Sequence, residues 1–154
     1  MTDRELAAVA RTIVDANLYM TLGTVDEAGN PWVSPVYYAH ADYRELYWVS
    51  QPEATHSRNL AARPGVSIVV FDSHTPIGNA QAVYMAAAAE ELDTADRDAG
   101  IEVFSRRSLE HGGTAWSAAR VESPAPLRLY RATVSAHWVL DPDDPRDRRI
   151  PVTP

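Results

Sequence analysis

The stretch from residue 29 to residue 72 constrains the fold of this chain most. It holds three runs of β-forming residues, at 32–39, 45–50 and 66–71, and one short helical piece at 54–62. Pro35 interrupts the first run, and because proline cannot donate a ladder hydrogen bond, that strand is expected at a sheet edge or a bulge. The last run is apolar at nearly every position, which predicts a strand buried on both faces.

The rest of the chain adds further strands and places helices around them. Thr2 and Glu5 form a capping box before an amphipathic segment, so a helix is expected at 3–16. Turn-forming residues at 26–30 separate two strands of a hairpin. The remaining expectations are a strand at 18–25, helices at 94–110 and 115–120, a long alternating strand at 127–140, and a proline-rich surface tail at 141–154.

Local signals conflict between residues 80 and 92. The run Met-Ala-Ala-Ala-Ala-Glu-Glu-Leu at 85–92 has high helix propensity. Tertiary context routinely overrides propensity, and we predict a strand here from the family resemblance described below. With this segment the chain has six strands, which close most easily into an antiparallel barrel with helices at its rim. At 154 residues the chain is expected to form one mainly β domain with α insertions.

The composition excludes several mechanisms. The chain has no cysteine, so disulfides, thiolate metal sites and a cysteine nucleophile are excluded. It also has no lysine, because all 14 basic residues are arginine, and this excludes a Schiff-base lysine and a P-loop lysine. The net charge of −7 argues against a nucleic-acid partner. No apolar run approaches the ~20 residues that span a bilayer, and no signal-peptide pattern is present, so a cytoplasmic protein is expected.

One cluster of polar residues is typical of phosphate binding. Thr55, His56, Ser57 and Arg58 stand at the start of the short helix, and Ser50 ends the preceding strand. The start of a helix offers free N–H groups and a positive dipole end, and arginine grips phosphate oxygens. The alternative is an ordinary capped surface helix with solvated polar side chains.

No competing catalytic motif is present. The five histidines form no H-E-x-x-H pair, and neither a G-x-S-x-G elbow nor a G-x-G-x-x-G fingerprint occurs, so a metal site is not expected. Tyr37, Tyr38 and His74 are the candidates for a general acid. Aromatic residues of the strands at 32–39 and 45–50 could line a planar cofactor or simply form the core.

Several stretches together resemble the pyridoxamine 5′-phosphate oxidase-like family of FMN-binding split β-barrels. They are G-N-P-W-V-S-P-V-Y-Y, L-Y-W-V-S, T-H-S-R-N-L-A-A-R-P-G-V-S-I-V-V-F, Q-A-V-Y-M-A-A-A-A-E-E-L and L-R-L-Y-R-A, in this order. The resemblance covers residues 19–140 and implies a homodimer with FMN at the subunit interface, acting on a small-molecule substrate.

The resemblance also implies which residues hold the cofactor. The residues it implies along the flavin ring and ribityl chain are Ser34, Pro35, Val36, Trp48, Val49 and Ser50. For the phosphate it implies Thr55, His56, Ser57 and Arg58, and at more distant positions Gln81, Trp116, Ser117, Trp138 and one of Arg146, Arg148 and Arg149. Family enzymes carry an arginine, a lysine and a further lysine where this chain has Ser34, Ala39 and His56. Phosphate binding would therefore rely on His56 and Arg58.

The resemblance predicts hydride transfer at the flavin, with a backbone N–H near Val36 facing the flavin N5 atom. The wider family includes deazaflavin (F420)-dependent reductases and members that bind haem or biliverdin. F420 is therefore the alternative cofactor. A non-catalytic flavin- or haem-binding module and a structural dimer with an empty site are the other interpretations.

Overall fold

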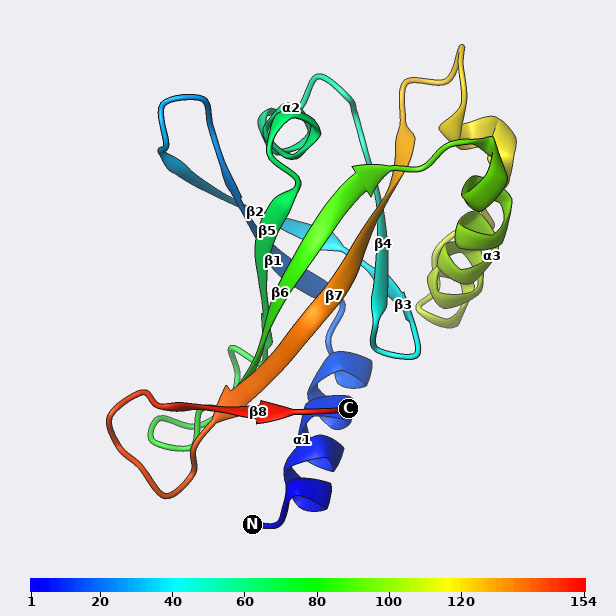
Figure 1. The fold of residues 1–154 in the computed structure, drawn as a ribbon. Coiled ribbons are helices and arrows are strands. Elements are labelled where there is room, and N and C mark those ends of the chain that lie inside the picture. Colours follow the sequence, from blue (N-terminus) through cyan, green and yellow to red (C-terminus); the bar gives the residue numbers. More distant parts are fainter.

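The computed structural model describes all residues, 1–154. Its centre is an eight-stranded, wholly antiparallel sheet, strongly curled, whose order is β2-β1-β5-β6-β7-β4-β3, with β8 added beside β7 (Figure 1). The strands are β1 (Tyr19–Val25), β2 (Pro31–Tyr37), β3 (Ala39–Ala41), β4 (Glu45–Ser50), β5 (Gly65–Phe71), β6 (Ala82–Glu91), β7 (Arg128–Leu140) and β8 (Arg149–Val152).

The sheet is a half-barrel whose two ends are joined by the chain itself. β2 and β3 follow each other in sequence, yet they occupy opposite ends of the strand order. The expected strand at 32–39 therefore divides into two strands with different partners. This division and the strand β8, which forms within the predicted surface tail, raise the strand count from the predicted six to eight.

Three helices and one 3-10 turn surround the sheet: α1 (Asp3–Ala16), α2 (Thr55–Ala62), α3 (Thr94–Glu110) and η1 (Ala118–Val121). α1 packs against β5, β6 and β8, and α2 contacts β1 and β6 at the opposite end of the sheet (Figure 1). α3 lies to one side, over β3, β4 and β7. None of these helices combines the length and apolar character that crossing a membrane would need.

The capping box predicted for α1 is present, since Glu5 N–H donates to Thr2 Oγ1 at 3.2 Å and Thr2 N–H donates to Glu5 Oε2 at 2.7 Å. The apolar face of α1 enters the main core, which fills the inside of the curl. A second, smaller core of seven buried residues lies on the other side of β4, under α3.

The alanine-rich segment is a strand, as the resemblance predicts and propensity does not. β6 is paired along its length with β5 on one side and β7 on the other. Its inward alanines, Ala87 and Ala89, are buried at the junction with the main core. The pairing with β7 is interrupted once, where Ser135 is the extra residue and its hydroxyl donates to Ala86 O at 3.1 Å. Two strand partners provide more hydrogen bonds and burial than a lone alanine helix at this position would have.

Candidate functional site

The sheet is open between β2 and β4. β4 pairs with β3 only from Glu45 to Tyr47, although it pairs with β7 along its whole length. β2 pairs with β1 and has no partner on its other edge. The edge of β4 from Trp48 to Ser50 and the free edge of β2 therefore keep unpaired backbone groups. We call these two unpaired edges the split.

The pairing of β3 with β4 shows which residues stand across the split. Ala39 lies opposite Tyr47, so continuing the same antiparallel register would bring Val36 opposite Ser50. This pairing does not form, because β2 diverges to pair with β1. Backbone N–H and C=O groups left unpaired in this way are available to bind a polar, planar ligand.

The predicted ring-side residues of β2 lie along this edge. Ser34 and Val36 are half-buried, and Val36 packs against the main core, whereas Pro35 is exposed opposite Thr21 of β1. The position of Pro35 on the edge strand β2 confirms the interpretation of its sequence signal.

The predicted residues of β4 have three different surroundings. Trp48 is fully buried in the main core, stacked on Tyr130 with ring centroids 5.7 Å apart, and its indole Nε1–H has no hydrogen-bond partner. Val49 faces the opposite way and packs against the smaller core. Ser50 is half-buried at the end of the strand. Trp48 as a whole has no exposed surface, so only Val49 and Ser50 of these three residues can meet a ligand at the split directly.

The start of α2 adjoins the end of β4 and is not capped. Ala54 occupies the N-cap position, where it has no side-chain oxygen to accept a bond, and no hydrogen bond reaches the N–H groups of the first turn. The first turn contains no acidic residue either. These free N–H groups and the helix dipole together favour an anion.

Three predicted phosphate-binding residues meet beside this helix start. Ser50 Oγ lies 2.9 Å from Nε2 of His56, and the buried Ser57 hydroxyl donates to Ser50 Oγ at 3.4 Å. Thr55 and Arg58 point outward and are exposed. Arg58 borders a hollow of about 360 Å³ shared with the β1–β2 hairpin. It remains the one predicted phosphate ligand with a permanent charge.

His56 does not carry the charge that the sequence suggested for it. Burial lowers the pKa of its imidazole, and no acidic group opposes that effect. The ring is therefore neutral at neutral pH and acts as a hydrogen-bond partner of Ser50.

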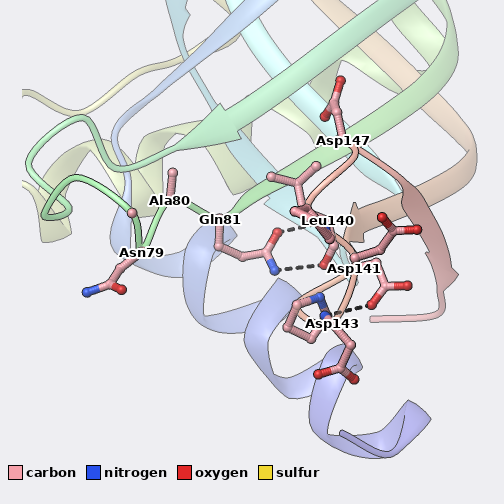
Figure 2. A pocket seen from close by; sticks show the side chains of 11 residues that line it. Asn79, Ala80, Gln81, Leu140, Asp141, Asp143 and Asp147 are labelled. Atoms are coloured by element: carbon pink, nitrogen blue, oxygen red, sulfur yellow. Dashed lines mark hydrogen bonds between the residues drawn. The ribbon is translucent and has the colours of Figure 1, made fainter.

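Gln81 lies away from the split, and its amide is already engaged (Figure 2). Its Oε1 accepts from Leu140 N–H at 2.8 Å and from Ala82 N–H at 2.9 Å, and its Nε2 donates to Leu140 O at 3.0 Å. It thereby ties the start of β6 to the end of β7. The adjoining cavity of about 750 Å³ is lined by Asp141, Asp143 and other acidic residues. No group of side chains there or elsewhere has the arrangement of a metal site.

Trp138 and Arg149 lie together on the outer face of the sheet. Both border an open, mainly apolar pocket of about 420 Å³, and the Arg149 guanidinium stacks on the Tyr84 ring at 3.6 Å. Arg146 is paired with Asp144 instead, and Arg148 lies 4.0 Å from an Asp141 carboxylate oxygen. Of the three C-terminal arginines, only Arg149 is therefore near Trp138.

Trp116 and Ser117 lie on the far side of the smaller core. The Trp116 ring packs edge-on against Phe104 of α3 at 5.4 Å, and the Arg120 guanidinium covers its face at 3.5 Å. Ser117 is exposed at the start of η1. Within one chain the split thus unites residues of β2, β4 and α2, whereas Gln81, Trp138 and the 116–117 segment are elsewhere.

The three candidate general acids differ in their burial and in their hydrogen-bond partners. Tyr38 is fully buried and donates to Val14 O at 2.6 Å, and burial strongly raises the pKa of its phenol. His74 is on an exposed loop, with 94% of its side chain open to solvent. Tyr37 alone stands at the end of the split, where its hydroxyl lies 2.8 Å from Nδ1 of His111.

Two supporting contacts have no signal in the linear sequence. Asn59 Nδ2 donates to Thr24 Oγ1 at 3.1 Å, and this buried bond fixes α2 on β1. Tyr130 of β7 reaches towards Ser57 and Glu91, with 3.4 Å between its hydroxyl and the Glu91 carboxylate. Each pair joins elements far apart in the chain, so only the fold brings its members together.

The comparisons with known proteins agree with this architecture. The family model described as pyridoxamine 5′-phosphate oxidase matches residues 6–140. No curated protein matches the chain. A haem-binding protein from Mycobacterium smegmatis has a similar fold, with a TM-score of 0.72 and 22% identity over 99% of this chain, which spans 58% of that protein.

Two further solved structures are similar over most of their own length. An FAD-binding protein from Mesorhizobium loti has a TM-score of 0.62 and 25% identity, covering 86% of this chain and 92% of that one. A protein described as an F420 reductase has a TM-score of 0.62 and 18% identity, covering 83% and 94%. Because the family model spans most of the sequence and the fold agrees, the chain belongs to the pyridoxamine 5′-phosphate oxidase family.

Proposed function

We propose that this protein is an FMN-binding oxidoreductase that transfers a hydride between the flavin and a small organic substrate. The observation that carries the proposal is the split itself, in which two unpaired strand edges lie beside an uncapped helix start. The edges suit a planar ring with polar atoms at its rim, and the helix start suits a phosphate. Membership of the family and the structural similarity to an FAD-binding protein agree with this choice.

The chain's own groups would hold the cofactor in three places. The backbone of Ser34, Pro35 and Val36 would line the ring, with one N–H near Val36 facing the flavin N5 atom. The free N–H groups at the start of α2 and the Ser57 and Ser50 hydroxyls would bind the phosphate, with Arg58 turning in from solvent. Bound flavin would supply the hydride chemistry, and the protein would orient it and restrict access of water.

The proposal includes a homodimer with the cofactor at the interface. Gln81, Trp138 and the segment at 116–117 stand outside the split of their own chain, so a second copy would be needed to bring them to it. An exposed apolar face of β1, β2 and β5 is available for this contact, with Val33 68%, Tyr19 60% and Phe71 48% exposed. By strand register these three side chains lie on one face of the sheet.

F420 is the second candidate cofactor, supported by the neighbour described as an F420 reductase. It carries a phosphate as FMN does, so the helix start suits both. A non-catalytic haem- or flavin-binding module is the third interpretation, supported by the haem-binding neighbour. Haem needs an axial ligand from the protein. His56 lies beside the split, but its Nε2 is already hydrogen-bonded to Ser50, so this atom would have to give up that bond to bind the iron.

The experiment is a spectrum of the purified protein followed by titration with FMN, F420 and haem. We expect a flavin spectrum or saturable FMN binding, and reduction of the bound flavin by a nicotinamide donor. Preferential binding of F420 would make F420 the cofactor in place of FMN and leave the rest of the proposal unchanged. Bound flavin that neither a nicotinamide nor F420 can reduce would favour a carrier, and a protein that binds neither FMN nor F420 would refute the proposal.

A further inference from the structure

A tyrosine and a histidine from distant parts of the chain form a pair at the end of the split. Tyr37 is the last residue of β2 and follows Val36 directly, and His111 is the C-cap residue of α3. The Tyr37 hydroxyl lies 2.8 Å from His111 Nδ1, and the two rings meet edge to face with centroids 5.9 Å apart. This contact joins residues 74 positions apart.

The surroundings fix the Tyr37 ring while leaving its hydroxyl near solvent. Phe104 packs against the ring edge-on at 5.6 Å and Tyr19 at 6.1 Å, and the hydroxyl remains at an exposed position. Successive side chains of a strand project on opposite sides, so the Tyr37 ring points away from the side of the buried Tyr38. It projects on the side of β2 that α3 approaches. An ordered phenol with an accessible oxygen is suited to proton transfer.

Burial keeps the Tyr37 phenol protonated. Burial raises the pKa of the phenol, Arg107 of α3 lowers it, and Glu110 and Tyr19 raise it further, with a net increase. Because the phenol keeps its proton at neutral pH, it can act as an acid but not as a base. His111 is exposed on the other side of the contact and can exchange protons with water.

We infer that Tyr37 donates a proton to the substrate and that His111 resupplies it, a role that rests on the proposed function. In the productive form, the His111 imidazolium donates its Nδ1–H to the Tyr37 oxygen, and the Tyr37 O–H points to the substrate. The Tyr37 proton passes to the substrate, and the His111 Nδ1 proton replaces it on the phenol. Water then reprotonates His111.

A substrate that such a donor suits is one whose reduction by hydride leaves an anion in need of a proton. An electron-poor double bond conjugated to a carbonyl takes a hydride at its β-carbon from the reduced flavin, which loses two electrons. The electron pair of the double bond moves towards the carbonyl, and the resulting enolate takes up the proton from Tyr37. The product is the saturated carbonyl compound, so atoms and charges balance.

The test uses the flavin-loaded protein with 2-cyclohexen-1-one as the probe. Stopped-flow measurement of flavin reoxidation, without oxygen, isolates the step in which the substrate is reduced. Tyr37→Phe is expected to slow this step by about 10²-fold, the lower range for general acid catalysis, with unchanged FMN affinity. Tyr43→Phe is the matched control, since it also removes a hydrogen-bonded phenol hydroxyl, one that donates to Asp15 at 2.7 Å from the turn between β3 and β4, and it should leave the rate unchanged.

The variant His111→Asn distinguishes a role of His111 in resupplying the proton from a purely structural role in holding Tyr37. Asparagine can keep a hydrogen bond to the Tyr37 hydroxyl but cannot pass on a proton, so the reoxidation rate should fall in this variant if His111 resupplies the proton and stay unchanged if it only holds the ring. The wild-type step should show a solvent deuterium isotope effect that Tyr37→Phe abolishes. A second measurement needs no flavin: the nitrogen NMR signals of His111 in the resting protein should shift in Tyr37→Phe and stay in place in Tyr43→Phe.

The outcomes distinguish this inference from the proposed function. Flavin binding with an unchanged rate in Tyr37→Phe, or no reduction of 2-cyclohexen-1-one, overturns the proton relay and leaves the flavoprotein proposal standing. Equal His111 signals in both tyrosine variants also overturn it. A protein that binds neither FMN nor F420 overturns both.

Discussion

FMN binding should become tighter as the pH falls, because His56 is neutral in the free protein. Burial lowers the pKa of this imidazole, and its Nε2 is paired with the Ser50 hydroxyl. A phosphate at the start of α2 would favour the charged ring and raise its pKa in the complex. The complex then holds more protons than the free protein, so affinity rises as the pH falls through the raised pKa of the complex and levels off below the lowered pKa of the free protein.

The magnitude follows from one hydrogen bond. A hydrogen bond to a charged group contributes about 1.5–3 kcal/mol, which is roughly 10- to 150-fold in Kd. The phosphate of FMN titrates near pH 6 itself, so the wild type alone does not isolate His56. His56→Gln keeps a donor for Ser50 and cannot ionise. The difference between its pH profile and that of the wild type is the contribution of the imidazole.

The assay is quenching of flavin fluorescence by the two proteins from pH 5 to pH 8, with FMN and with riboflavin, which has no phosphate. We expect the FMN-to-riboflavin affinity ratio to increase at low pH more steeply in the wild type than in His56→Gln. Thermal melts of both proteins check that the substitution leaves the fold intact. Parallel pH profiles of the ratio in the two proteins would refute the reasoning.

Three further substitutions test the site and its support. Arg58→Gln should weaken FMN binding about tenfold, the effect of one charge-assisted bond, and leave riboflavin binding unchanged; equal losses for both ligands would contradict a phosphate contact. Asn59→Ala removes the buried bond to Thr24 and should lower the free energy of unfolding by about 1–3 kcal/mol in urea titrations, whereas an unchanged midpoint would show that α2 does not depend on it. Gly100→Ala adds a Cβ 2.8 Å from Tyr47 Cε1. The resulting overpacking costs about 1–3 kcal/mol and should exceed the gain of about 1 kcal/mol in helix propensity, so the variant should melt at a lower temperature. A higher melting temperature would show that the neighbouring side chains move aside.

Sequence patterns identified most elements, because burial alternates with strand period along β1 and much of β7. The prediction that the apolar run of β5 is buried on both faces was wrong, since Ser67 and Phe71 are exposed on its outer face. The helical bias of β6 was misleading, since its alanines are stabilised by two neighbouring strands that lie far away in the sequence. The division of β2 from β3 and the pairing of β8 also depend on partners, and no local signal marks them. Pro35 was informative because its missing N–H limits it to an edge whatever the neighbours are.

The candidate site shows the same distinction. The cluster of Ser50, His56 and Ser57 is close in sequence, and the fold brings its side chains together as the spacing suggested. The protonation of His56 depends on burial, which the sequence does not show. The engagement of Gln81 with Leu140 was equally hidden, because its partner is a backbone group 59 residues away. The pairing of Tyr37 with His111 likewise required α3 to be placed over β3.

The most direct test of the account is an NMR titration that follows the backbone amides as FMN is added. In the proposed complex the phosphate binds the uncapped start of α2 and the ring lies along the split. The amide signals of Thr55, His56 and Ser57, together with those of Val36 and Ser50, should therefore shift with a common saturation curve. Saturable FMN binding that leaves the amides of Thr55, His56 and Ser57 unshifted would contradict it.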